Sequence, residues 1–236
     1  MTQQLILDLP AIPNPSLSSF VEGRNAAALD ALRQLQPGRA LYLWGPNGCG
    51  RSHLLRALCA EAPGLYLDAN TDVARYAPPS PDDAAPLRLI AIDDIHCLNE
   101  ARQAALFSLY NRWREAAGGA HAFALLLAGD QSPMGMPIRE DLRTRLGWDL
   151  VFRLEQLSDE DRATAMAGQA QQRGLRLGPE VVSWILTHYS RDMSQLTALI
   201  DALDRYSLAR HRAITLPLLR ELLANEPPAS PQSDSA

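Results

Sequence analysis

Residues 41–55 read LYLWGPNGCGRSHLL, and this stretch decides the fold. Gly45, Gly50, Arg51 and Ser52 follow the spacing G-x-x-x-x-G-[K]-[ST] of a phosphate-binding loop. An apolar run with strand composition precedes the loop, and leucines at helical spacing follow it. The glycines let backbone N–H groups converge on phosphate oxygens, and the N-terminus of the following helix adds partial positive charge. The hydroxyl of Ser52 is placed to hold Mg²⁺.

The loop predicts a set of nucleotide-binding residues. It departs from the pattern at one position, because Arg51 stands where the pattern has lysine. The predicted set is Gly45, Pro46, Asn47, Gly48, Cys49, Gly50, Arg51, Ser52 and His53. All 22 basic residues of the chain are arginine, so a chain-wide preference explains Arg51 if fast, lysine-dependent turnover is not essential. Two plainer interpretations stay open: a Gly/Pro connection between strand and helix, and an ordinary helix residue at His53.

Composition narrows the class of protein. With 236 residues, 47% hydrophobic and 21% charged, the chain has the composition of a soluble globular protein. The formal net charge of −5 argues against a stand-alone DNA-binding protein, because phosphate contacts dominate the affinity of such proteins. The first apolar residues are interrupted by Asp8 and closed by Pro10, so we expect no secretory signal. No apolar run approaches the length of a membrane span, so we expect none. The scattered cysteines form no metal-ligand pattern and fit a reducing cytoplasm.

Alternation of strand and helix patterns predicts an α/β fold with a parallel sheet. The expected strands are 40–44, 64–68, 88–92 and 122–128. Asn25 is expected to cap the first helix, and 70–86 is expected to be a surface loop. The predicted domains are a flexible arm (1–15), a nucleotide-binding α/β domain (16–156), a small all-helical domain (157–224) and a disordered tail (225–236).

The run Leu89 to Ile92 ends in two carboxylates, Asp93 and Asp94. A buried strand that delivers an aspartate beside the phosphate loop completes the Mg²⁺ site of many nucleotidases. Asp93 is the expected metal ligand. Asp94 occupies the place where a longer glutamate often polarises the attacking water. The alternative is that the pair caps a helix.

These features together resemble an AAA+ domain followed by its helical lid, and within that superfamily they resemble the replication initiator DnaA. The likeness covers residues 14 to about 224. Residues 20–25, FVEGRN, resemble the entry segment that flanks adenine, which implies that Phe20 and Val21 contact the base. Gly129-Asp130 resembles sensor 1, which implies that Asp130 lies near the γ-phosphate.

Two arginines acquire roles from the same resemblance. Residues 142–148, LRTRLGW, resemble the arginine-finger box, with Arg145 in the finger position. Residues 190–193, SRDM, resemble sensor 2, with Arg191 as the phosphate-reading arginine of the lid. Taken singly, each arginine has an ordinary alternative as a solvated surface charge.

Two departures separate the chain from the initiator. We expect no helix-turn-helix domain after the lid and no long N-terminal oligomerisation domain. In their place the arm carries QLILDL, in which Gln4, Leu5, Leu7 and Leu9 resemble the peptide that docks in the groove of the replication sliding clamp. A stray N-terminal strand is the alternative.

This combination, including the loop arginine, resembles the Hda family of DnaA-related regulatory inactivators. The resemblance implies a negative regulator that binds the DNA polymerase III sliding clamp and promotes hydrolysis of ATP bound to DnaA. Arg145 would act in trans, and an adenine nucleotide in the chain's own loop, ADP more than ATP and with Mg²⁺, would be a structural ligand. Contact with DNA would run through the clamp, intrinsic ATPase activity would be weak, and a homo-oligomer stays open.

The sequence leaves two competing functions open. An independent AAA+ ATPase, such as a helicase loader or a DnaA-like motor, needs turnover by the isolated chain, which Arg51 disfavours. A small-molecule P-loop kinase needs a substrate pocket, and it needs neither the Gln4–Leu9 peptide nor Arg145.

Overall fold

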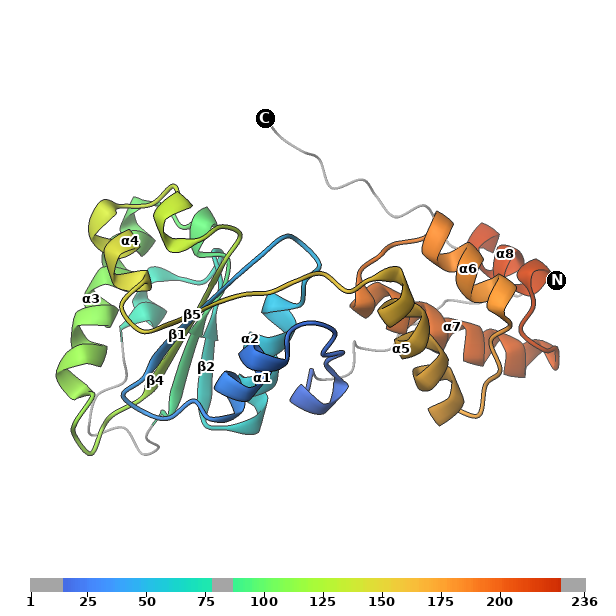
Figure 1. Ribbon diagram of the computed structural model, residues 1–236, viewed down its shortest axis with the longest axis horizontal. Helices are drawn as coiled ribbons and strands as arrows, with labels where there is room; N and C mark the ends of the chain where they lie inside the picture. Colours follow the sequence, from blue (N-terminus) through green and yellow to red (C-terminus); the bar gives the residue numbers. More distant parts are fainter. Residues whose placement is uncertain (1–14, 78–86, 226–236) are drawn as a thin grey trace. The chain divides into compact units, whose positions relative to one another are not determined.

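A computed structural model describes residues 15–77 and 87–225 (Figure 1). The described chain forms two compact units, the first ending at Ser158 and the second beginning at Asp159. The predicted arm at 1–15, apart from its last residue, lies outside the described residues, as does almost all of the predicted tail. In the described parts of the chain, no helix combines the length and the apolar character that crossing a bilayer requires.

The first unit is built on a five-stranded parallel sheet in the order β2-β3-β4-β1-β5. The strands are β1 (Ala40–Trp44), β2 (Gly64–Leu67), β3 (Leu89–Ile92), β4 (Ala124–Gly129) and β5 (Leu150–Arg153). In the register, Tyr42 of β1 lies beside Leu127 of β4 and Val151 of β5. The predicted parallel sheet is confirmed, although β4 begins two residues later than the sequence pattern indicated.

Two hydrophobic clusters cover the two faces of the sheet. Along β1, Tyr42 belongs to one cluster while Leu41 and Leu43 belong to the other, as the alternation of side chains along a strand requires. Helices α1 (Ala26–Arg33) and α2 (Arg51–Glu61) pack in the cluster of Leu41, and helices α3 (Glu100–Ala116) and α4 (Glu140–Leu146) pack in that of Tyr42. Both faces are buried, which is why β3 and β4 are continuous apolar runs.

Short 3₁₀ helices join these elements: η1 (Leu17–Ser19), η2 (Val73–Tyr76), η3 (Ile95–Cys97) and η4 (Pro133–Gly135). The second of them lies inside the stretch predicted as a plain loop, where Asp72 caps it by accepting a hydrogen bond from the amide of Ala74 at 2.8 Å. The predicted capping role of Asn25 is wrong in its chemistry. This residue precedes α1, but its side chain bonds to the backbone of Glu155 and not to the helix.

The second unit is all helical, as predicted. Its helices are α5 (Asp159–Gln172), α6 (Pro179–His188), α7 (Met193–Arg210) and α8 (Leu216–Asn225). They share one apolar core, to which every helix contributes at least one buried residue. Pro179 opens α6, where its missing N–H costs nothing, and Asp192 caps α7 by accepting from the amides of Ser194 and Gln195.

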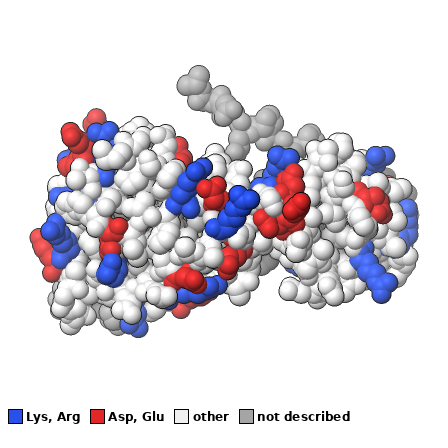
Figure 2. All heavy atoms as spheres, viewed as in Figure 1, with Lys and Arg blue, Asp and Glu red and all other residues white. Residues whose placement is uncertain are grey.

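On the face drawn in Figure 2, basic and acidic side chains are interspersed over each unit, and neither sign forms a continuous patch. This distribution agrees with the modest negative net charge of the sequence.

Candidate nucleotide site

The phosphate-loop sequence lies at the carboxyl end of β1, and α2 begins at Arg51, the seventh residue after β1. In a parallel sheet, ligands bind beyond the carboxyl ends of the strands, where neighbouring connections leave in opposite directions. Gly48 and Gly50 have φ angles of 76° and 97°, which favour glycine. A Cβ at Gly50 would lie 2.5 Å from the Phe20 ring, so only glycine lets the entry segment approach the loop this closely.

Arg51 is buried, with 7% of its surface exposed. Its Nη1 donates to the carbonyl oxygens of Gly45 and Gly129, the latter at 2.7 Å, and its Nη2 donates to Asn47 Oδ1 at 3.3 Å. The structure thus places the guanidinium against the loop's own backbone and against the last residue of β4. The planar fork satisfies several acceptors at once, which an ammonium group of lysine would do less rigidly.

The predicted acidic pair follows β3. Asp93 is buried at 1% exposure, and its carboxylate accepts hydrogen bonds from the Tyr66 hydroxyl at 2.8 Å and from the amide of Asp94 at 2.9 Å. Asp94 adopts the left-handed conformation (φ 46°), and its Oδ1 lies 3.8 Å from Arg51 Nη2. Burial and then the charge of Asp93 raise the pKa of Asp94, and the charges of His96 and Arg51 oppose this shift.

The predicted sensor 1 residue, Asp130, follows β4 directly. Its Oδ1 lies 3.7 Å from Nδ1 of His96, a residue of η3. The chain after it is held by Tyr42, whose hydroxyl donates to the carbonyl oxygen of Gln131. The ends of β1, β3 and β4 therefore bring the loop, the acidic pair and Asp130 to one edge of the sheet.

The predicted adenine-side residues are held against this edge by His53. Its Nε2 lies 3.0 Å from the carbonyl oxygen of Ser16 and 3.2 Å from Ser19 Oγ, and its ring lies 5.8 Å from the ring of Phe20. Val21 follows in the same segment. The structure thus gives His53 a part in positioning the entry segment, which the sequence pattern did not reveal.

These residues fit a phosphorylated ligand. The first amides of α2 have no acceptor within the helix, and Arg51 supplies a cation. The Mg²⁺ ligands predicted from the sequence are the Ser52 hydroxyl and the Asp93 carboxylate, and the described residues contain no group of three or more metal-ligating side chains. Such a site suits an ion that brings phosphate and water ligands with it, as Mg²⁺ does.

Arg145 lies elsewhere in the same unit. It belongs to α4, and its guanidinium carbon sits 3.7 Å from the centre of the Phe107 ring on α3. Within residues 15–77 and 87–225, no hydrogen bond or ion pair joins its side chain to Arg51 or to the acidic pair. Arg145 therefore makes no direct contact of this kind with the groups at the phosphate loop in the part of the chain that the structure describes.

Arg191 belongs to the helical unit and precedes α7. Its guanidinium pairs with Asp159 at 3.2 Å and is exposed. Asp159 also accepts from the buried Arg162, which in turn donates to the backbone oxygen of Arg191. The four residues predicted to bind the clamp, Gln4, Leu5, Leu7 and Leu9, lie outside the described residues.

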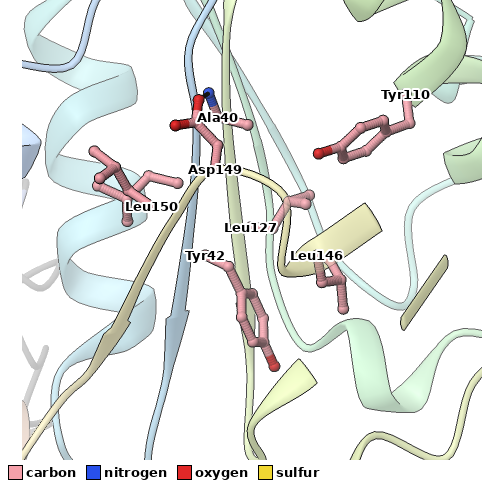
Figure 3. A pocket seen from close by; sticks show the side chains of 8 residues that line it. Ala40, Tyr42, Tyr110, Leu127, Leu146, Asp149 and Leu150 are labelled. Carbon is pink, nitrogen blue, oxygen red and sulfur yellow. Dashed lines mark hydrogen bonds between the residues drawn. The ribbon is translucent and has the colours of Figure 1, made fainter. Parts of the chain in front are cut away.

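A gap within the first unit is not a second ligand site. It lies among β1, β4, β5 and the two helices on that face, and Figure 3 shows Tyr42, Tyr110 and Leu146 facing it. It leaves no room for a water-sized molecule. The edge of the sheet at the phosphate loop remains the candidate site.

Comparison with known proteins gives both units a relative. Residues 159–223 match the family model described as "Hda, lid domain". Domain III of DnaA from Thermotoga maritima superposes with a TM-score of 0.68 at 20% identity, covering 90% of this chain and 97% of that one. AMPPCP-bound DnaA from Aquifex aeolicus gives 0.61 at 19% identity, covering 80% and 64%. A RuvB variant from Thermotoga maritima gives 0.63 at 16% identity, covering 90% and 72%.

At these identities the solved structures establish the fold alone, whereas the lid match comes from the sequence itself. Adenine nucleotides bind to homologues of this fold, as the AMPPCP-bound DnaA structure illustrates. The chain therefore has an AAA+ fold similar to that of DnaA domain III, and its helical unit matches the lid of the Hda family.

Proposed function

We propose that this chain is a negative regulator of replication initiation, which binds the sliding clamp and promotes hydrolysis of the ATP bound to DnaA. The observation that carries the proposal is the match of residues 159–223 to the Hda lid. The AAA+ fold supports it, because proteins of this fold can contribute an arginine to a neighbour's nucleotide site. The chain would act in the cytoplasm, where replicating DNA carries the clamp.

Arg145 is the proposed finger. A guanidinium is always charged, so it stabilises the charge that develops on a transferred phosphoryl group without any proton transfer. In the described residues, its guanidinium lies against aromatic rings of α3 and against Trp148, and no hydrogen bond or ion pair joins it to the chain's own loop, which supports action on a partner's nucleotide. Phosphoryl transfer needs positioning and charge stabilisation above all, and both can come from across an interface.

The chain's own loop would hold an adenine nucleotide, ADP more than ATP, as a structural ligand. Arg51 is already engaged with the carbonyl oxygens of Gly45 and Gly129, so its fork is poorly placed to follow a γ-phosphoryl group in transit. Phe20, Val21 and His53 would flank the base, Ser52 and Asp93 would hold Mg²⁺, and Arg191 would read the phosphates from the lid. Asp94 and Asp130 would be the catalytic carboxylates of the chain's own nucleotide site, and the intrinsic ATPase activity of this site would be weak.

The partners of this proposal are DnaA, the clamp and, through the clamp, DNA. Gln4, Leu5, Leu7 and Leu9 would fill the clamp groove as a short extended peptide. The net charge of −5, together with the interspersed charges on the face drawn in Figure 2, supports DNA contact through the clamp, because direct binding relies on a basic surface.

An independent ATPase is the second candidate, and a specific observation favours it: the loop, the acidic pair and Asp130 meet at one sheet edge. The two functions differ in where ATP is hydrolysed. Purified DnaA loaded with labelled ATP should hydrolyse it faster when this chain and clamp-loaded DNA are added together. No acceleration, combined with robust turnover by the isolated chain, would favour the second candidate.

A further inference from the structure

The guanidinium of Arg145 lies in a cage of aromatic rings. Its carbon atom is 3.7 Å from the centre of the Phe107 ring, 5.5 Å from that of Trp148 and 6.0 Å from that of Tyr110. Phe107 and Tyr110 are three residues apart on α3, so both project from one face of that helix toward α4. The rings of the cage thus come from α3 and from Trp148, which follows α4.

The backbone of Arg145 is fixed as well as its side chain. The Tyr110 hydroxyl donates a hydrogen bond to the carbonyl oxygen of Arg145 at 2.8 Å. Burial raises the pKa of this tyrosine to about 12, so the hydroxyl stays protonated and remains a donor. Edge-on contacts to Trp113 and Trp148 hold the Tyr110 ring, and Figure 3 shows that ring reaching inward beside Leu146 and Leu127.

The cage holds the charge of Arg145 without neutralising it. Elsewhere in this unit Arg39 pairs with Asp149. Arg139, whose guanidinium carbon lies 5.3 Å from the centre of the same Phe107 ring, pairs with Asp141. Among the residues that the structure describes, no carboxylate forms an ion pair with Arg145, and its Nη1 is buried without a hydrogen-bond partner. The negative faces of the rings therefore provide the attraction that a carboxylate would otherwise provide.

We propose that Phe107 is the positioning residue for Arg145, holding its un-neutralised guanidinium by stacking so that it is presented ready for an anionic phosphoryl group. The inference rests on the proposed function, because it assigns how the finger is prepared. A finger paired with a carboxylate would have to break an ion pair before acting. A stacked guanidinium keeps its full charge, and because the rings already restrict its rotation it loses less conformational freedom on engagement.

The first test concerns the free chain and needs no partner. In protein with isotope-labelled arginine, the signals of the Arg145 side chain, assigned by their loss in Arg145→Ala, should carry the ring-current shift of Phe107. Phe107→Leu keeps an apolar side chain of similar size but removes the π face, so these signals should move to ordinary arginine positions. Phe107→Tyr should keep the shift, and Phe152→Leu, the same change in a phenylalanine of β5, should leave it unaltered.

The second test measures DnaA-bound ATP hydrolysis against the concentration of this chain, with clamp-loaded DNA present. Phe107→Leu should lower the maximal rate by roughly two- to thirtyfold, the value of one cation–π contact, and leave the half-saturating concentration nearly unchanged. Phe107→Tyr should restore the rate. A merely structural role would instead shift the half-saturating concentration or unfold the chain.

Two results would overturn the inference: Arg145 signals that do not move in Phe107→Leu, or signals that move while the maximal rate equals that of wild type. A wild-type chain that gives no acceleration would contradict the proposed function. The signals of the free chain would then still decide whether Phe107 places Arg145.

Discussion

The guanidinium of Arg51 donates a hydrogen bond of 2.7 Å to the carbonyl oxygen of Gly129, the last residue of β4. Through its further bond to Gly45, the same side chain joins the end of β1 to the end of β4. Asp130 follows Gly129 immediately. One buried cation therefore links the phosphate loop to the residue expected to sense the γ-phosphate.

Removing this link should destabilise the first unit. In Arg51→Ala the carbonyl oxygens of Gly45 and Gly129 lose their donor, and an unsatisfied buried acceptor costs about 1–3 kcal/mol. We expect the free energy of unfolding in urea to fall by about that amount. Arg33→Ala removes an exposed arginine paired with Asp30 and should change it by less than about 0.5 kcal/mol. Equal stability of the two variants would show that the buried bonds contribute nothing.

Restoring lysine should favour turnover of ATP by the chain itself. An ammonium group is a compact charge with rotatable donors, so in Arg51→Lys it can follow the γ-phosphoryl group that the rigid fork cannot. We expect the intrinsic rate to rise roughly tenfold, equivalent to about 1.4 kcal/mol in the barrier, and ADP to lose its advantage over ATP in equilibrium titrations. A wild-type chain that already prefers ATP and turns it over rapidly would refute the assignment of a structural nucleotide.

Asp149 should make stability depend on pH. Burial disfavours its charge, but hydrogen bonds from Arg39 and from the amide of Ala40 outweigh burial and hold the pKa of Asp149 below its ordinary value of 3.8. A carboxylate with a lowered native pKa stabilises the fold above that ordinary value, and this stabilisation is lost as pH falls through the native pKa.

Asp149→Asn should therefore lower the free energy of unfolding by roughly 1 kcal/mol at pH 7, since the partner Arg39 is partly exposed. The difference from wild type should shrink once the pH falls below about 3.8. Thermal melts at several pH values measure it, with Asp30→Asn as the exposed control. A difference that persists undiminished in acid would mean that charge is not its cause.

The arm should carry clamp binding. Gln4 offers one polar anchor, and Leu5, Leu7 and Leu9 offer three apolar anchors for an extended peptide. Deleting residues 1–10 should abolish retention of the chain on immobilised clamp and leave its melting temperature unchanged. Retention at the wild-type level would place the clamp-binding surface elsewhere.

The sequence predicts the sheet edge well, because local signals place each of its parts. The loop spacing fixes residues 45–52, and a buried run ending in Asp93 and Asp94 fixes the neighbouring strand. Since parallel strands end at one edge, these parts must meet, and the structure brings them together. Hydrophobic alternation likewise predicts the layers, and periodicity predicts the helical unit.

The supporting contacts are invisible in the sequence, because they join residues far apart along the chain. The Tyr66 hydroxyl donates a hydrogen bond to Asp93, the side chain of Asn25 bonds to the backbone of Glu155, and Phe107 stacks on Arg145. Taken alone, each of these residues has an ordinary interpretation. The helix-capping role expected of Asn25 is an example of a prediction that a contact distant in sequence overturns. Its position before α1 is that of a cap, but the backbone of Glu155 competes successfully for its side chain. Only the folded chain decides between such partners.

The central claim is that Arg145 acts on a partner's nucleotide, and single-turnover hydrolysis tests it most directly. DnaA carries labelled ATP, the chain carries ADP, and the clamp is loaded on DNA. Fingers of this kind accelerate hydrolysis by roughly 10³- to 10⁵-fold in other nucleotidases, so Arg145→Ala should abolish nearly all the acceleration while folding and clamp binding persist. Arg145→Lys should also fail. Arg33→Ala, which removes an exposed arginine of α1 already paired with Asp30, should keep the acceleration. Wild-type acceleration by Arg145→Ala would contradict the account.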